Sequence, residues 1–338
     1  MTMKRLTITF TTGIAIALTA AWSFAQLKIV VTGLGPTAVK QLQDSARGAA
    51  VVSADRDRLA EQAVDADAII GTITPELFSA AKKLRWVQVY SAGVEAYVFP
   101  ELVSSDVVLT NCKILQGPNI ADHALALLLA LTRNLNVAMP NRMQEEWKPS
   151  RYSPIELRGR TAVIIGVGGI GLQIAQRAHG FDMKVIGVDP KEQPLNYFIS
   201  RSVLPDRLDD VLPEADVVFV AAPFTPRSQG MMGRKQFGLM KKGSYFIAVS
   251  RGRTYDTESL VAALDTGRLA GAGLDVTNPE PLPKGHPLWK RQNVIITPHI
   301  AGQSDAVQAR RMALILENVS RFVRGEPLLN VVDKKKGY

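Results

Sequence analysis

The sequence predicts an α/β protein with two successive units, each a parallel β-sheet covered by helices. From Leu27 onward, short apolar runs alternate with helical patterns, and the same alternation starts again at Arg160. A long apolar helical pattern at residues 119–140 separates the two stretches. Such βαβ alternation is typical of parallel sheets, and a chain of 338 residues is long enough for two domains.

In the first unit, the apolar runs are short and end at glycine or polar residues, as buried strands do. We expect strands within residues 27–35, 49–55, 67–71 and 85–95, and helices at 37–46 and 76–84. The pattern at 119–140 predicts one long buried helix that ends near Pro140 and joins the two units. The amphipathic stretch at 304–325 predicts a final helix that packs back on the first unit.

In the second unit, the runs again read as buried strands that alternate with helices. We expect strands within residues 161–168, 183–190, 215–223, 243–252, 269–276 and 293–299. A helix at 169–180 follows the first of them and ends at Gly180.

Charge, cysteine and histidine content exclude several classes of protein. The single Cys112 excludes an internal disulfide framework. Four scattered histidines without ligand spacing predict no metal site. The net charge of +9 is not gathered into an arginine-rich arm or a basic patch with aromatics, so no nucleic acid partner is expected.

The first 25 residues differ from the rest. Lys4 and Arg5 precede an uncharged apolar run, and the small residues Ser23 and Ala25 come just before Gln26. This is the three-part pattern of a secretory signal peptide, so residues 1–25 predict an exported, periplasmic protein. The run is also long enough for an uncleaved anchor, which is the only membrane contact expected. A wrongly chosen start codon would instead make the protein cytoplasmic.

The stretch after the first strand of the second unit is rich in glycine. Gly166, Gly168 and Gly171 have G-x-G-x-x-G spacing between a strand and a helix, and Asp189 ends the next strand. That context predicts a dinucleotide site, because backbone amides at a helix N-terminus bind pyrophosphate. Asp189 can accept hydrogen bonds from the ribose hydroxyls and would repel a 2′-phosphate, so we expect NAD as the cofactor.

Polar residues follow other strands of the second unit, where ligands of parallel sheets bind. They are Arg251, Asp275, Glu280 and His299. A histidine can exchange a proton, a neighbouring carboxylate favours its protonated form, and an arginine can bind a carboxylate substrate. Each residue alone also fits a structural role, such as an ion pair, a turn cap or a backbone hydrogen bond. Together, at successive strand ends, they predict a reaction site for hydride transfer.

With these motifs in place, nearly all of the chain after residue 25 resembles the D-isomer-specific 2-hydroxyacid dehydrogenases. The segment SAGVE at 91–95 is similar to the family's substrate loop, and NIADHALALLLALTRNL to its domain-joining helix. GVGGIG, AAPFTP, VSRG, GAGLDVTNPEP and TPHIAG follow in the family's order. The resemblance implies two doubly wound domains, a flavodoxin-like substrate domain and a Rossmann NAD-binding domain, with the active cleft between them. It assigns residues 26–119 and 302–338 to the first domain and 120–301 to the second.

The resemblance also implies roles for single residues. Arg251 would bind and polarise the substrate, and His299 would be the acid–base group, paired with Glu280. The remaining residues would contact the substrate carboxylate or the cofactor. The substrate contacts are Ala92, Gly93 and Val94, and the cofactor contacts are Gly166, Gly168, Gly169, Ile170, Gly171, Asp189, Pro223, Thr225 and Asp275.

Two functions remain open on the sequence alone. The first is an enzyme that interconverts a small 2-oxo acid, such as glyoxylate or hydroxypyruvate, and its D-2-hydroxy acid with NAD, as a homodimer. The second, suggested by the signal segment, is an exported protein that binds a carboxylate or nucleotide without turnover. The intact set of Arg251, Glu280 and His299 favours the enzyme.

Overall fold

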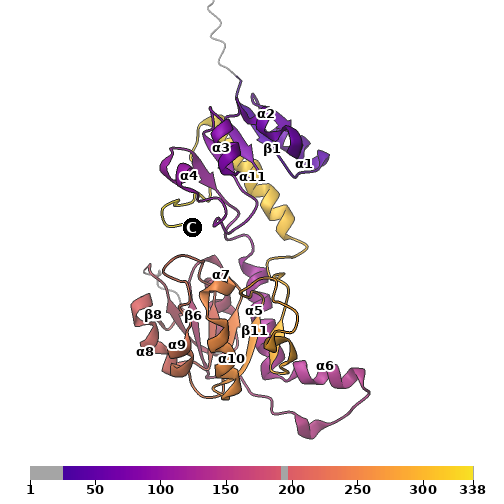
Figure 1. The fold of residues 1–338 in the computed structure, drawn as a ribbon, viewed down its shortest axis with the longest axis vertical. Coiled ribbons are helices and arrows are strands. Elements are labelled where there is room, and N and C mark those ends of the chain that lie inside the picture. The colour runs from indigo at the N-terminus through magenta and orange to yellow at the C-terminus, as the bar shows by residue number, and fades with distance from the viewer. Residues whose placement is uncertain (1–25, 192–196, 338) are drawn as a thin grey trace, which may run out of the picture.

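The computed structural model describes residues 26–191 and 197–337, which form two lobes with one parallel sheet each. Figure 1 shows the lobes stacked along the long axis, with the N-terminal strands in the upper lobe and the glycine-rich unit in the lower one. The predicted α/β class with two parallel sheets is confirmed. The predicted signal segment at residues 1–25 lies outside the described residues.

The upper lobe contains a five-stranded parallel sheet in the order β2-β1-β3-β4-β5, which is flavodoxin-like. Its strands are β1 (Lys28–Val31), β2 (Ala50–Ser53), β3 (Ala68–Ile70), β4 (Trp86–Gln88) and β5 (Val108–Thr110). Its helices are α1 (Pro36–Ser45), α2 (Leu59–Ala63), α3 (Pro75–Ala80), α4 (Pro100–Ser104) and α11 (Val307–Arg324).

The lower lobe contains a seven-stranded parallel sheet in the order β12-β11-β10-β9-β6-β7-β8. Its first strand, β6, is internal, and the chain continues outward on both sides, as in Rossmann sheets. The strands are β6 (Thr161–Ile165), β7 (Lys184–Val188), β8 (Arg201–Val203), β9 (Val217–Val220), β10 (Ser244–Ala248), β11 (Leu269–Leu274) and β12 (Val294–Ile296). The helices are α7 (Gly169–Gly180), α8 (Leu208–Val211), α9 (Arg234–Leu239) and α10 (Thr257–Asp265).

Helices cover both faces of the upper sheet, which explains its continuous apolar strands. Ile29 and Val31 pack in the layer that contains α1 and α11, whereas Val30 packs in the opposite layer. The rings of Trp86 on β4 and Phe322 on α11 lie 5.1 Å apart between centroids. The final helix therefore returns to the first unit, as the sequence predicted.

The prediction of one long helix at residues 119–140 is wrong. The structure has two helices, α5 (Gly117–Thr132) and α6 (Leu135–Met143), and Pro140 lies inside the second. They are separated at Asn134, which has a left-handed φ of 57°. Asparagine tolerates this conformation, and its Oδ1 accepts a hydrogen bond from the backbone N–H of Ser153 at 3.0 Å. The apolar pattern continues across the break and so conceals it.

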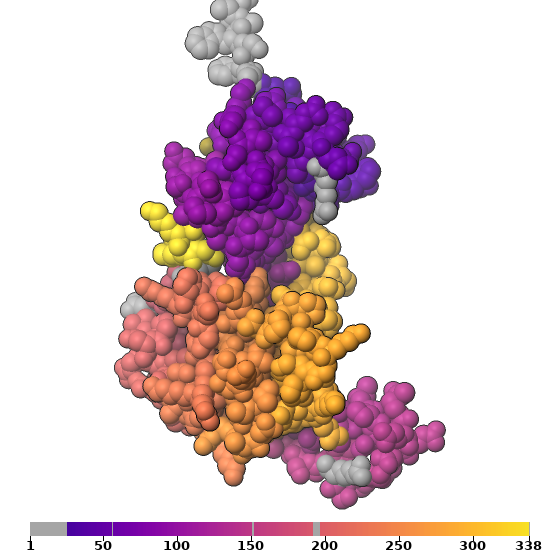
Figure 2. Space-filling model, in the orientation of Figure 1, coloured from indigo at the N-terminus to yellow at the C-terminus, as the bar shows by residue number. Residues whose placement is uncertain are grey.

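The region around α6 forms an arm. Figure 2 shows it in magenta, projecting away from the lower lobe, while the two lobes meet at a waist. Among the described residues, the structure has no helix whose length and apolar character would suffice to cross a membrane.

Candidate active site

The glycine loop between β6 and α7 has no room for a side chain at two of its glycines. Gly166 has a φ of 88°, and a Cβ added there would lie 2.5 Å from the backbone nitrogen of Ala222. A Cβ on Gly171 would lie 1.9 Å from the carbonyl oxygen of Gly166. At Gly168, by contrast, a Cβ would meet no other atom within 4 Å. The loop therefore leaves a cradle at the N-terminus of α7 that fits a pyrophosphate.

The first turn of α7 contains two more predicted cofactor residues. A Cβ on Gly169 would lie 3.2 Å from Ile114, which comes from the segment that leads out of the upper lobe. Ile170 packs against the hydrophobic layer that includes α5. These contacts place the cradle beside the segment through which the chain passes from the upper lobe to the lower lobe.

Asp189 lies directly beside the glycine loop. Its Oδ2 accepts a hydrogen bond from the backbone N–H of Val167 at 2.8 Å, and its Oδ1 accepts one from the N–H of Lys191 at 2.9 Å. A carboxylate has about four acceptor positions, so Asp189 can hold the loop and still accept hydrogen bonds from ribose hydroxyls.

The segment that contains Pro223 and Thr225 packs on the other side of the loop. Ala222 lies against Gly166, as described above. The hydroxyl of Ser228 donates to the carbonyl oxygen of Pro223 at 2.7 Å, and the N–H of Thr225 donates to that hydroxyl at 2.8 Å. The segment is thus a turn at the edge of the cradle that is fixed by hydrogen bonds to Ser228. Its contacts with a cofactor stay a prediction.

His299 and Glu280 form a direct pair beyond the carboxyl ends of β12 and β11. The His299 Nδ1 lies 2.6 Å from the Glu280 Oε1, and both side chains are about two-fifths exposed, at 42% and 41%. When Nδ1–H donates to the carboxylate, Nε2 remains available to a ligand. The structure thus brings together the two residues that the sequence proposed as an acid–base pair.

The loop that carries His299 has an unusual backbone. His299 has a left-handed φ of 53°, and its N–H donates to the carbonyl oxygen of Asp275 at 3.0 Å. The Asp275 carboxylate is 2% exposed and accepts hydrogen bonds from the N–H groups of Ile300 and Ala301, both at 3.0 Å. Asp275 therefore lies beneath the loop that carries His299 and holds it, while its predicted cofactor contact remains a prediction.

Two residues that hydrogen-bond beneath the His299 loop, His123 and Thr297, were not predicted from the sequence. His123 on α5 lies with its Nε2 2.8 Å from the Thr297 hydroxyl, which donates to Asp275 Oδ1 at 2.6 Å. Because that hydroxyl has one proton and gives it to the carboxylate, His123 must donate from Nε2. Nothing in a helical apolar pattern signals such a contact 174 positions along the chain.

Arg251 reaches from the end of β10 to the loop of the upper lobe that contains Ala92, Gly93 and Val94, the predicted substrate contacts. A Cβ on Gly93 would lie 2.0 Å from the Arg251 Nη2. The Arg251 Nη1 donates to the carbonyl oxygen of Ser250 at 2.8 Å, and its Nε donates to Glu95 Oε1 at 3.0 Å. The structure thus brings Arg251 next to the predicted loop, and their substrate contacts stay a prediction; Glu95 was not predicted.

The single cysteine lies behind this region but has no catalytic character. Cys112 is buried, and burial raises the pKa of its thiol to about 11. A reactive cysteine needs a lowered pKa and access to solvent, so Cys112 is a core residue.

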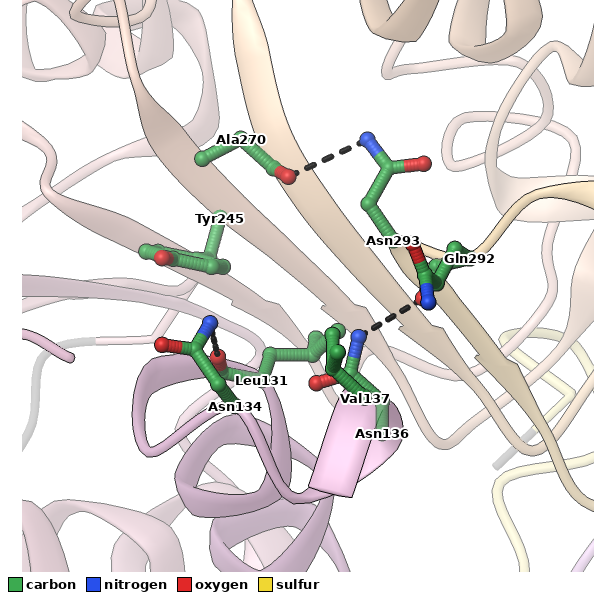
Figure 3. Close-up of a pocket in the computed structure, with 8 residues that line it drawn as sticks. All are labelled: Leu131, Asn134, Asn136, Val137, Tyr245, Ala270, Gln292 and Asn293. Atoms are coloured by element: carbon green, nitrogen blue, oxygen red, sulfur yellow. Dashed lines mark hydrogen bonds between the residues drawn. The ribbon is translucent and has the colours of Figure 1, made fainter. Parts of the chain in front are cut away.

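A separate hollow of about 310 Å³ lies between the end of α5, the start of α6 and the amino ends of β10 and β11. Figure 3 shows its lining, in which Asn136 donates to the carbonyl oxygen of Gln292 and Asn293 to that of Ala270. Parallel sheets bind ligands at the opposite, carboxyl ends of their strands. The hollow is therefore distinct from the candidate active site.

Comparisons with known proteins identify the family of this chain. A family model described as "D-isomer specific 2-hydroxyacid dehydrogenase, NAD binding domain" matches residues 125–301. The glyoxylate reductase of Korarchaeum cryptofilum is 33% identical over 284 residues, which cover 81% of this chain and 85% of that protein. The D-3-phosphoglycerate dehydrogenase of Methanocaldococcus jannaschii is 32% identical over 313 residues; these cover 91% of this chain but only 59% of that longer relative.

A solved structure has the same fold over almost the whole length. It is the D-isomer specific 2-hydroxyacid dehydrogenase from Xanthobacter autotrophicus Py2 in complex with NADPH and MES, with a TM-score of 0.80 and 27% identity, covering 93% of this chain and 100% of that one. The chain belongs to the D-isomer specific 2-hydroxyacid dehydrogenase family. The predicted family is confirmed, and with it, at family level, the predicted class of oxidoreductase that acts on CH–OH donors.

Proposed function

We propose that this chain is an NAD-dependent reductase of a small 2-oxo acid, of the size of glyoxylate or hydroxypyruvate, which forms the D-2-hydroxy acid or catalyses the reverse reaction. The observation that carries the proposal is the pair of His299 Nδ1 and Glu280 Oε1, 2.6 Å apart, in the lobe that holds the glycine cradle. The relative named glyoxylate reductase supports a small substrate.

The chain's own residues have distinct parts in this reaction. A bound nicotinamide would supply the hydride. His299 would give the proton from Nε2 to the carbonyl oxygen of the substrate, while Glu280 holds Nδ1 and stabilises the charged ring. Arg251 would bind the substrate carboxylate and polarise the carbonyl, together with N–H groups of residues 92–94.

The proposed preference for NADH over NADPH rests on Asp189. Its carboxylate lies at the glycine loop, with hydrogen bonds of 2.8 and 2.9 Å to backbone N–H groups. A fixed negative charge there favours the ribose hydroxyls and disfavours a 2′-phosphate. The Xanthobacter relative is a complex with NADPH, so the preference is a proposal for this chain alone.

The test is NADH oxidation by the purified protein over a panel of 2-oxo acids, with His299→Ala as the comparison. We expect turnover that falls about 10²–10⁴-fold in the variant, the usual contribution of a general acid–base group. NADH binding, followed by nucleotide fluorescence, should persist. If the wild-type protein binds NADH but reduces no member of the panel, the proposed reaction is refuted and the non-catalytic binding protein gains support.

We also propose a homodimer formed through the arm. Four large apolar side chains are exposed there, on α6 and just beyond it: Leu135, Met139, Met143 and Trp147, the last 93% exposed. Exposed apolar patches of this kind mark protein interfaces. Met143→Asp should shift the mass measured by sedimentation from dimer to monomer, whereas a wild-type monomer would refute the proposal.

Export is the proposed location, supported by the sequence pattern of residues 1–25. N-terminal sequencing of the native protein tests it. A mature chain that begins at Gln26 would support export with cleavage, and an intact Met1 on a protein recovered from the cytoplasm would refute it.

A further inference from the structure

We propose that Glu95 is a specificity-determining residue whose carboxylate occupies the substrate-carboxylate site, so that an incoming 2-oxo acid must displace it from Arg251. The inference deepens the proposed function and rests on it. Three features of the described residues carry it: a loop with free N–H groups, the position of Glu95 over that loop, and the contact that it makes with Arg251.

The first feature is the hydrogen bonding of the loop at residues 92–94. Its carbonyl groups are all used inside the upper lobe. Asn111 donates to the oxygen of Ala92 at 2.6 Å, Ser91 to that of Gly93 at 2.6 Å, and Tyr97 to that of Val94 at 2.8 Å. The N–H groups of the same three residues make no hydrogen bond to any described residue. The N–H groups of residues 92–94 are therefore available as donors to an anion, which is how a backbone binds one.

The second feature is the position of the Glu95 carboxylate. A Cβ on Gly93 would lie 2.5 Å from Glu95 Oε2 and 2.0 Å from Arg251 Nη2. The carboxylate and the guanidinium thus both lie directly over the middle residue of the loop. A side chain at position 93 would have to displace one of them.

The third feature is the charge pairing. Arg251 donates from Nε to Glu95 Oε1 at 3.0 Å, and both side chains are 35% exposed. A guanidinium can bind a carboxylate through two parallel donors, and Glu95 uses one donor of Arg251, its Nε, that a substrate carboxylate could use. The pair joins the two lobes across 156 residues of sequence.

It follows that Glu95 weakens the binding of substrate without taking part in the chemical step. Removing its charge while keeping its shape should weaken its hydrogen bond with Arg251 from charged to neutral and remove the repulsion of an incoming anion. Both side chains of this ion pair are 35% exposed, so the pair contributes only modestly to the stability of the protein. One unit charge a few ångströms from an anion changes the affinity for that anion by about tenfold or more. We expect the KM for a 2-oxo acid to fall about tenfold in Glu95→Gln, with kcat changed less than about twofold, because only ground-state competition is lost.

The experiment measures oxalate binding by calorimetry to the full chain, both free and saturated with NADH. Oxalate is a planar dicarboxylate of the substrate's size and is not turned over. The variants are Glu95→Gln and Glu95→Ser, and the matched control is Glu101→Gln, which removes the same charge from an exposed position on α4. Circular dichroism and NADH affinity report whether each variant keeps the fold.

Tighter oxalate binding by about tenfold in both Glu95 variants, with no change in the control, supports the proposal. Binding by the variants but not by the wild type supports it as well. Equal or weaker binding overturns it, and Glu95 would then hold Arg251 in position instead. Absence of binding in all proteins also overturns it. Because no turnover is needed, this result is independent of whether the chain reduces any 2-oxo acid.

Discussion

Replacing Asp275 by Asn should destabilise the catalytic loop and separate two possible roles of this residue. The carboxylate is 2% exposed and accepts three hydrogen bonds, from Thr297 Oγ1 at 2.6 Å and from the N–H groups of Ile300 and Ala301 at 3.0 Å. An amide keeps only one acceptor oxygen, and its NH₂ group would face the N–H of Ala301. One hydrogen bond is therefore lost, and two change from charged to neutral.

The magnitude follows from these contacts. Hydrogen bonds to a charged group contribute about 1.5–3 kcal/mol and neutral ones about 0.5–1.5 kcal/mol, and an unpaired buried donor costs about 1–3 kcal/mol. The two weakened hydrogen bonds and the unpaired donor together cost about 3–6 kcal/mol. Removing a buried charge offsets part of this, which leaves a loss of about 2–3 kcal/mol in the free energy of unfolding.

The same substitution should lower kcat more than it changes the KM for NADH. His299 lies in the loop that Asp275 holds, and misplacement of a reacting group by about 1 Å can reduce the rate about 10²-fold. Denaturant unfolding and steady-state kinetics measure the two effects, with Asp44→Asn on the exposed side of α1 as control. An unchanged unfolding free energy together with a raised KM for NADH would refute the loop-support argument and favour a direct cofactor contact.

Three further predictions concern single groups. Glu280→Gln should lower kcat about 10-fold or more in steady-state kinetics, because Nδ1 of His299 loses its charged acceptor; an unchanged kcat would contradict the pairing. Asp189→Ser should raise the ratio of NADPH to NADH efficiency, since the repulsion of a 2′-phosphate disappears; a constant ratio would separate Asp189 from cofactor choice. Burial raises the pKa of Cys112 from 9.0 to about 11, so above pH 9 the unfolded thiol ionises first and the free energy of unfolding should fall as pH rises to 11, by at most about 2 kcal/mol. Cys112→Ala should show a smaller fall than the wild type in unfolding curves measured at pH 8 to 11, by this amount, because Tyr90, Tyr245 and Tyr255, whose pKa values burial also raises, contribute to both proteins above pH 10; an equal fall in both proteins would contradict the assignment to Cys112.

The positions of several candidate site residues could be predicted from local sequence, while their roles stay predictions. The glycine spacing before α7 and the polar residues after β7, β10 and β11 could be assigned because parallel strands end at one edge of the sheet. His299 and Glu280 are 19 positions apart and do form a pair. The direction in which each side chain points was harder to predict. Asp275 follows β11 as expected, but strand periodicity does not tell whether a residue beyond the strand faces a ligand or lies under the next loop.

The failed helix prediction has a different physical origin. Periodicity is read from the order of apolar residues, and apolar residues continue from α5 into α6, where Leu135, Met139 and Met143 are exposed. A single left-handed residue, Asn134, changes the direction of the chain without changing composition. Its tertiary contact with Ser153 stabilises the break, and a contact of that kind has no counterpart in a one-dimensional pattern.

The two halves of the candidate site differ in how they are assembled. The acid–base half is complete inside the lower lobe and its joining helix, because His299, Asp275 and Thr297 are held together with His123 by hydrogen bonds of 2.6–3.0 Å. The substrate half exists only where Arg251 meets the loop at residues 92–94 of the other lobe. A movement of the lobes would therefore change the carboxylate site and leave the proton-transfer pair intact. The sequence motifs predicted Arg251 and the loop at residues 92–94, but the ion pair between Arg251 and Glu95 joins residues 156 positions apart and has no motif of its own.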